Sequence, residues 1–252
     1  MQDDFKNSLR VSPEYVKKTA DRIKKIIAIN EKYFSKEYRD LYKNHFLNEF
    51  LELKSAFPEI DFDYLGRFKN KESMIEKINR KINDEQKTGN VYDNFANKII
   101  VYSVNGDTDE VLLRNSCNRI LDFLVTYRSN LSGEYFEELI DKRKNYIEIP
   151  KPNGYQAIHL IRKHVNENAP DFLSETQIRT FRMEEQQKFG NSSHANNYKK
   201  GKTITLSRCP IFLKISRSKK TGLYKAHELT LEESYNEYKS YINSSSNKKE
   251  RA

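Results

Sequence analysis

The sequence contains no tryptophan and only two cysteines, eight glycines and six prolines among its 252 residues. Cys117 and Cys209 lie far apart and neither belongs to a Cys-x-x-Cys pair, so neither a zinc site nor thiol redox chemistry has support. No apolar run approaches the roughly 20 residues that a membrane span needs, and the first ten residues lack the apolar core of a secretory signal. We therefore expect a soluble, cytoplasmic protein with no membrane partner.

The glycine-rich motifs that commonly bind nucleotides are also missing. The sequence has no P-loop, no Gly-x-Gly-x-x-Gly and no Gly-x-Ser-x-Gly. This excludes the commonest way of holding phosphate groups on the backbone N–H groups of a loop. Any ATP site must therefore be built on another scaffold.

Acidic residues are in the minority. The 45 Lys and Arg residues outnumber the 36 Asp and Glu residues, for a formal net charge of +9. This excess favours contact with phosphates, nucleic acid or an acidic partner. A lysine-rich surface without any such partner would look the same, so charge alone does not choose.

Helical periodicity dominates the first part of the chain, and short β-branched runs follow. Ser12-Pro13, Ser35 and Asn70 each precede apolar residues at helical spacing, and Pro58 ends the second pattern. Further helices are expected over residues 111–124, 183–189 and 230–242, and strands over residues 99–102, 145–149, 157–165, 173–180, 212–215 and 223–227.

Strands and helices alternate without the regular rhythm of a doubly wound fold. The expected class is therefore α+β, a mixed or antiparallel β-sheet flanked by helices. We expect an N-terminal helical extension over residues 1–60, the main domain over residues 61–243 and a disordered tail over residues 244–252.

The most informative stretch runs from Lys151 to His159, with the letters KPNGYQAIH. Pro and Asn-Gly predict a turn that leads into a strand and presents Tyr155 at the mouth of the sheet, with His159 on the same face. The tyrosine ring there could stack on a base. A plain hairpin turn with a packed tyrosine is the alternative.

Carboxylates occur beside two of the expected strands. Alternation places Glu175, Gln177 and Arg179 on one strand face, and Asp93 precedes the strand at 99–102. Two carboxylates at neighbouring strand ends suit Mg²⁺, which prefers carboxylate, water and phosphate oxygens. The alternatives are a half-exposed strand with a cross-strand ion pair and an aspartate that only forms a turn.

A basic segment lies upstream of these carboxylates. Arg67 and Lys69 are followed by Ser73, Lys77 and Arg80, and the last two are neighbours on one helix face. These side chains offer the cations that a triphosphate needs. By itself the helix is equally typical of a solvated basic surface.

Taken together, five segments in the same order resemble the synthetase domain of the RelA/SpoT alarmone enzymes, over roughly residues 65 to 200. The combination of PKPNGYQAIH with ETQIRT is specific to that family. The five segments are Gly66–Lys69 with Ser73 and Lys77, Asp93–Ile99, Asn145–His159, Glu175–Thr180, and Met183 through Gly190 and His194 to Lys199.

The resemblance implies a nucleotidyltransferase-like synthetase fold and a Mg²⁺-dependent pyrophosphokinase. Such an enzyme transfers the β,γ-pyrophosphate of ATP to a ribose 3′-hydroxyl. Carried over to this sequence, Asp93 and Glu175 would bind the metal and act in catalysis, with Glu175 able to serve as general base. ATP would be held by Arg67, Lys69, Ser73, Lys77, Arg80 and Lys98, and the acceptor by Asn153, Tyr155, His159, Gln177, Arg179 and His194.

The chain also departs from the family pattern. Ala96 stands where a glycine is usual and Lys98 where an arginine is usual; lysine keeps the charge but cannot grip phosphate in a planar bidentate way. Lys188 and Ala195 replace a usual glutamate and tryptophan. These changes leave the identity of the acceptor open.

Three readings follow. The first is a small, single-domain alarmone synthetase without an HD-type hydrolase region, which makes (p)ppGpp from ATP and GDP or GTP, with homo-oligomers as an expected assembly. The second is the toxin of a toxin–antitoxin pair that pyrophosphorylates the 3′ CCA end of deacylated tRNA, or makes adenosine alarmones; the basic runs at 22–25 and 217–220 favour it. The third is an inactive nucleotide- or RNA-binding module.

Overall fold

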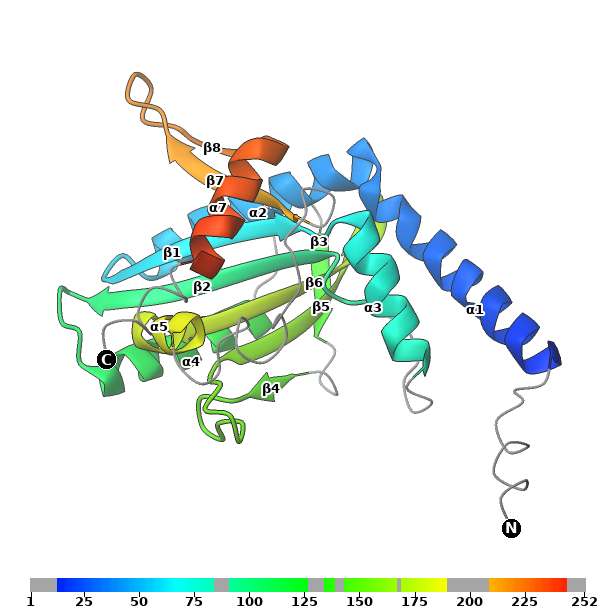
Figure 1. Ribbon diagram of the computed structural model, residues 1–252. Coiled ribbons are helices and arrows are strands. Elements are labelled where there is room, and N and C mark those ends of the chain that lie inside the picture. Colours follow the sequence, from blue (N-terminus) through cyan, green and yellow to red (C-terminus); the bar gives the residue numbers. More distant parts are fainter. Residues whose placement is uncertain are drawn as a thin grey trace, which may run out of the picture.

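A mixed β-sheet forms the body of the protein in the computed structural model (Figure 1). The structure describes residues 13–83, 91–126, 134–138, 143–166, 169–189 and 209–243. The strand order is β3-β5-β6-β2-β1-β7-β8, and β4 pairs with β5. The strands are β1 (Ile60–Phe68), β2 (Phe95–Val104), β3 (Glu134–Glu138), β4 (Lys144–Asn145), β5 (Ile158–Asn166), β6 (Ala169–Thr180), β7 (Ile211–Arg217) and β8 (Tyr224–Glu228).

The expected fold class is confirmed. Strands β2 and β6, at the centre of the sheet, pair in parallel, whereas the other described pairs of strands are antiparallel. Helices α2 (Lys36–Ala56) and α4 (Glu110–Thr126) cover one face, and α5 (Phe181–Phe189) and α7 (Leu231–Asn243) lie against the other (Figure 1). Helix α1 (Pro13–Glu31), the short 3₁₀ helix η1 (Lys32–Phe34) and α3 (Lys71–Asn83) lie at one end of the sheet.

Local sequence signals place most of these elements. The backbone N–H of Tyr38 donates to the hydroxyl of Ser35, which caps α2 as expected, and α2 ends two residues before Pro58. The expected hairpin over 212–227 is confirmed as β7 and β8. The expected strand over 145–149 is wrong beyond Asn145, because the Asn145 side chain accepts from the backbone N–H groups of Ile147 and Glu148 and starts a turn.

Strand β1 is absent from the sequence-based expectations. Its burial alternates along its length, with Ile60, Phe62 and Tyr64 buried and Asp61 and Asp63 exposed. This period of two is the usual mark of a half-buried strand. The strand matters for function because it carries the basic segment at 67–69 into the centre of the sheet.

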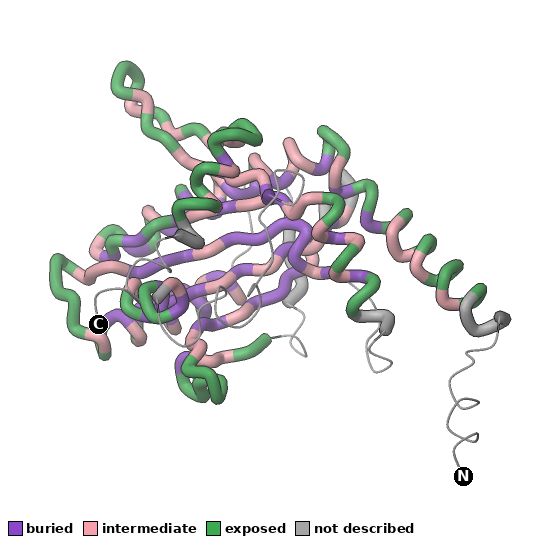
Figure 2. The backbone as a smooth tube through the Cα atoms, in the orientation of Figure 1, coloured by how far each residue is buried: buried purple, intermediate pink, exposed green. Residues whose placement is uncertain are grey.

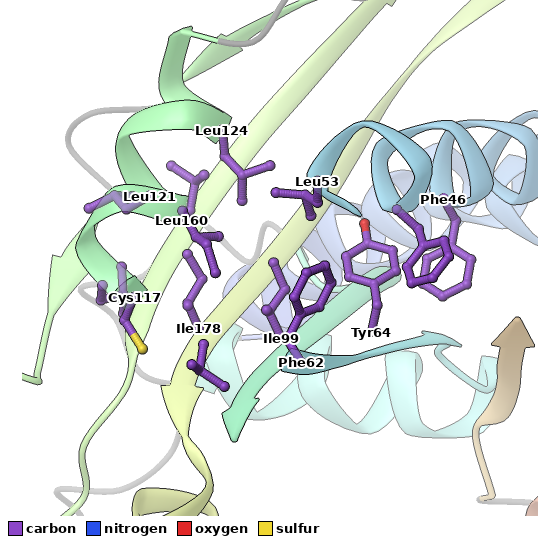
Figure 3. Close-up of a cluster of buried hydrophobic side chains, with 14 of the residues drawn as sticks. Phe46, Leu53, Phe62, Tyr64, Ile99, Cys117, Leu121, Leu124, Leu160 and Ile178 are labelled. Carbon is purple, nitrogen blue, oxygen red and sulfur yellow. The ribbon is translucent and has the colours of Figure 1, made fainter. Parts of the chain in front are cut away.

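The hydrophobic core fills the space between the sheet and helices α2 and α4 (Figures 2 and 3). In Figure 3, Phe46 of α2 stacks on Tyr64 of β1, with ring centroids 4.5 Å apart. Leu121 and Leu124 of α4 belong to the same cluster as Leu160 and Ile178. A Cβ at Gly66 would come within 2.8 Å of the Phe46 ring, so glycine there lets α2 approach the sheet closely.

A buried polar network lies within this same layer. Glu49 of α2 accepts two hydrogen bonds from the guanidinium of Arg162 of β5, and both side chains are fully buried. Tyr64 donates to Glu49 over 2.5 Å, and Arg162 also donates to Thr176 of β6 over 2.8 Å. Because each charge has several partners, the network ties α2 to three strands without leaving an isolated buried charge.

A second, smaller apolar cluster fixes α3. Met74, Ile78 and Val91 are buried against Ile23 and Ile27 of α1. This packing turns the polar side of α3 toward the start of β2. Among the described residues, no helix is long and apolar enough to span a membrane.

Candidate active site

One face of the sheet gathers most of the predicted site residues. Strand alternation turns them away from α2 and α4, whose side carries the core. In the parallel β2–β6 pair, Ala96 lies opposite Glu175 and Lys98 opposite Gln177, and His159 of β5 lies on the other side of Gln177. Residues far apart in the sequence are therefore placed on adjacent strands of one surface.

The first group on this surface is built around Asp93. Its two carboxylate oxygens accept from the ammonium groups of Lys77 over 2.6 Å and Lys69 over 2.7 Å, and the Arg67 guanidinium lies 3.9 Å away. Burial would raise the pKa of Asp93, but these three cations outweigh it and hold that pKa well below its usual value. Burial also lowers the pKa of Lys69 to about 8, against the pull of Asp93.

The second group is a chain of hydrogen bonds that ends on Glu175. A carboxylate only accepts, so Nδ1 of His159 donates to Oε1 of Glu175 over 2.8 Å. Nε2 of His159 shares a hydrogen bond of 2.7 Å with the Tyr155 hydroxyl, and the same hydroxyl accepts from Arg179 over 3.2 Å. Burial raises the pKa of Glu175, yet the interactions with His159 and Lys77 together bring it below its usual value.

The predicted turn holds Tyr155 in this position. Gly154, at a φ of 78°, donates its N–H to the carbonyl of Lys151, and the backbone N–H of Tyr155 is capped by the Asn153 side chain. The Tyr155 ring packs edge-on against Tyr146 at 6.0 Å, and the Lys151 ammonium lies 4.7 Å from its centroid. The result is an aromatic wall with cations beside it, a surface suited to a base that carries phosphates.

Lys98 belongs to a third group, which is centred on a buried carboxylate. Its ammonium donates to Oε1 of Glu184 on α5 over 2.9 Å, and Oε2 of Glu184 lies 3.3 Å from the Arg179 guanidinium. Lys188, one turn along α5, lies 3.7 Å from the same carboxylate. One buried carboxylate thus faces three cations.

Comparison with known proteins gives these groups a context. Residues 66–203 match the model of the region found in RelA/SpoT proteins, and this match spans more than half of the chain. The chain belongs to the RelA/SpoT family. The predicted family is thereby confirmed, and the matched segment contains every residue of the three groups above.

Two relatives illustrate the likeness. The probable chloroplastic GTP diphosphokinase CRSH of Arabidopsis thaliana is 29% identical over 171 residues, which is 67% of this chain but only 27% of that protein. The chain therefore spans about a quarter of the length of this curated relative. The crystal structure of small alarmone synthetase 1 from Bacillus subtilis, bound to its product pppGpp, superposes with a TM-score of 0.50 at 20% identity. The superposition covers 69% of this chain and 84% of that one, and it shows that the fold is shared.

Asp93 and Glu175 fit the divalent metal that this RelA/SpoT resemblance implies. Both side chains offer carboxylate oxygens, the ligands that Mg²⁺ prefers, and the Asp93 charge adds to burial in raising the pKa of Glu175. Among the described residues there is no cluster of three or more His, Cys, Asp and Glu side chains arranged for a metal. A Mg²⁺ ion here would therefore complete its coordination with substrate phosphates and water, as this ion usually does.

Not every predicted RelA/SpoT site residue joins the groups. Arg80 of α3 is exposed, and Asn153 is exposed and shapes the turn. Ser73 is half-buried on α3, and His194 lies outside the described residues. The roles of all the predicted site residues, these four included, remain predictions.

The sequence analysis gave no role to three side chains that lie in these groups. Tyr146 and Lys151 flank Tyr155, and Glu184 holds Lys98. Tyr146 and Lys151 lie inside the motif stretch, so an aromatic and a lysine beside the turn were available as signals. Glu184 had no sequence signal, because its partner Lys98 is 86 residues away.

Proposed function

We propose that this chain is an ATP-dependent pyrophosphokinase that transfers the β,γ-pyrophosphate of ATP to the 3′-hydroxyl of GDP or GTP. The hydrogen-bond chain that joins Tyr155, His159 and Glu175 carries this proposal. In this hydrogen-bond chain one histidine lies between an aromatic ring that can stack on a nucleobase and a carboxylate that can act as a general base. The Arabidopsis relative, named a probable GTP diphosphokinase, supports a guanosine acceptor.

The cations around Asp93 would receive the triphosphate. Lys69 and Lys77 each donate to Asp93 in the absence of substrate, and the Arg67 guanidinium is one-third exposed beside them. Phosphate oxygens offer these side chains stronger acceptors in greater number. Asp93 and Glu175 would hold Mg²⁺, which supplies charge neutralisation on the phosphates when bound.

The residues around Tyr155 would orient the 3′-hydroxyl of the acceptor nucleotide, which is the attacking group. A base stacked on Tyr155 would place its ribose near Glu175, and this carboxylate can take the proton of the 3′-hydroxyl. The acceptor oxygen then forms a bond to the β-phosphorus while the bond between that phosphorus and the oxygen bridging to the α-phosphate breaks. AMP leaves with that oxygen, and the proton on Glu175 passes to solvent.

The deciding experiment incubates the purified protein with Mg²⁺ and γ-labelled ATP, with GDP, GTP, AMP, ADP or deacylated tRNA in separate tubes. We expect label in the guanosine products with one AMP formed per transfer. Glu175→Gln should abolish transfer while still binding ATP. Label in none of the tubes would overturn the pyrophosphokinase proposal and leave the inactive binding module.

A tRNA acceptor is a second candidate, and one observation favours it. The β7–β8 hairpin projects from the body of the protein, and its outer part is exposed (Figures 1 and 2). It carries Arg217, Lys219, Lys220 and Lys225, all exposed and without an ion pair to any described residue. Such a surface suits a phosphate backbone, and label appearing only in the tRNA tube would establish this alternative.

An antitoxin partner, a homo-oligomer and a cytoplasmic location remain predictions. The antitoxin and the homo-oligomer follow from the family resemblance, and the cytoplasmic location follows from the lack of long apolar runs and of a secretory signal. Adenosine acceptors are covered by the AMP and ADP tubes of the same experiment.

A further inference from the structure

Glu184, in the first turn of α5, received no role in the sequence analysis. Helix α5 begins at Phe181, directly after β6 ends at Thr180, and the Thr180 hydroxyl accepts from the backbone N–H of Met183. This cap turns the first turn of α5 back over the site-bearing face of the sheet. Met183 and Glu184 are both buried there.

Glu184 is buried and faces two positively charged side chains. Its exposure is 4%, and its carboxylate lies 2.9 Å from the Lys98 ammonium and 3.3 Å from the Arg179 guanidinium. Arg179 is itself fully buried, and its Nε and Nη1 have no hydrogen-bond partner among the residues that the structure describes. The buried Arg179 guanidinium and the half-buried Lys98 ammonium therefore both face the Glu184 carboxylate, which can orient and neutralise them.

We propose that Glu184 is a positioning residue of the transfer site, which keeps Lys98 protonated and aims Lys98 and Arg179 at the phosphates of the bound nucleotides. The proposal rests on the pyrophosphokinase function proposed above. It also accounts for the lysine at position 98, where arginine is usual in the family. A guanidinium stays charged when buried, whereas an ammonium does not unless an anion supports it.

The charges around Lys98 agree with this role. Burial lowers the pKa of Lys98 to about 8, and Glu184 is the group that opposes this shift, while Arg179 and Arg67 add to it. The cross-strand neighbours of Lys98, Leu65 and Gln177, are uncharged. On α5, Lys188 faces Glu184 and adds one more cation to the group. Removing the Glu184 charge should therefore lower the pKa of Lys98 below 8.

The test separates this positioning role from a structural one. In Glu184→Gln, Lys98 should titrate about one to three pH units lower than in the wild type. NMR of ¹³C-labelled lysine follows this titration, and the signal that disappears in Lys98→Arg identifies Lys98. The alkaline limb of kcat/KM for ATP should move to lower pH by a similar amount. Adding Lys98→Arg to Glu184→Gln should restore activity at alkaline pH, because arginine stays protonated.

Two further variants serve as controls for loss of charge and for loss of stability. Glu185→Gln removes the same charge from the next, exposed residue of α5 and should change neither the Lys98 titration nor the pH profile. Glu184→Asp keeps the charge and should lie between the wild type and Glu184→Gln if the glutamine variant proves unstable. An unchanged Lys98 titration in Glu184→Gln, or no rescue by Lys98→Arg, would overturn the proposal. Absence of transfer by the wild type would instead overturn the proposed function, and the titration would still report on the pair.

Discussion

At the scale of single residues, Tyr155 combines two roles in one side chain. Its ring faces the cations of Lys151 and Arg179, and its hydroxyl shares a hydrogen bond with His159. The ring and the hydroxyl can be removed separately. The residue therefore allows acceptor binding and the orientation of His159 to be measured apart.

Tyr155→Ala should raise the KM for the acceptor far more than the KM for ATP. Loss of base stacking costs about 1–3 kcal/mol, which corresponds to roughly 5- to 150-fold. Steady-state kinetics with each substrate varied in turn give the two constants. Equal increases in both would show that Tyr155 does not contact the acceptor.

Tyr155→Phe is the matched control for this prediction. It keeps the ring and removes only the hydrogen bond to His159, so acceptor KM should stay close to the wild-type value while kcat falls. A rise in acceptor KM as large as that of the alanine variant would contradict the stacking role.

At the scale of elements, α2 is fastened to the sheet by charge as well as by apolar packing. Glu49 and Arg162 pair in the buried layer directly beneath β5 and β6, whose opposite face carries His159 and Glu175. Arg162 and Thr176 point toward the helix, and their strand neighbours point toward the site. The same two strands thus serve the core and the chemistry on their two faces.

Arg162→Ala should destabilise the protein by about 3–5 kcal/mol, because it leaves the Glu49 carboxylate buried without its main partner. Urea unfolding followed by circular dichroism measures this loss. The double variant Glu49→Leu/Arg162→Met should lose much less, since no buried charge remains. Lys163→Ala, which removes a half-exposed pair with Asp171, is the control and should cost no more than about 1 kcal/mol. A loss for Arg162→Ala as small as that of the control would show that the network carries little stability.

At the scale of the whole molecule, several buried titratable groups make stability depend on pH. The pKa values of Glu49, Asp93 and Glu184 are held below their usual values: burial opposes this, but the several cationic partners around each carboxylate together outweigh it. Burial also holds the pKa of His164 well below 6.5. Each of these groups binds a proton more readily in the unfolded chain than in the folded one.

Stability should therefore fall as pH falls. Below about pH 6.5 the unfolded chain protonates His164, and below about pH 4.5 it also protonates the carboxylates, so it binds more protons than the folded protein. Urea midpoints measured from pH 7 to pH 4 should decrease, with a steeper decrease below pH 5. The double variant Glu49→Leu/Arg162→Met should show a shallower slope at the acid end. A midpoint that stays constant over this range would contradict the assignment of these buried charges.

The sequence by itself determined the family and most of the elements, and the assignment of the site residues stays a prediction. The motif of a Pro and Asn-Gly turn followed by a strand placed Tyr155 and His159 together, because a tight turn and strand alternation are local properties. The Ser35 cap and the proline that follows α2 likewise set that helix from adjacent residues. These predictions required only interactions within a few residues of the chain.

Only the tertiary structure decided which charges meet. The parallel pairing of β2 with β6 sets Lys98 beside Gln177, and the turn into α5 then delivers Glu184 to Lys98. The pairing of Glu49 with Arg162 spans 113 residues. Contacts of this kind depend on how strands are ordered and how helices pack, and a single sequence carries no local pattern for them.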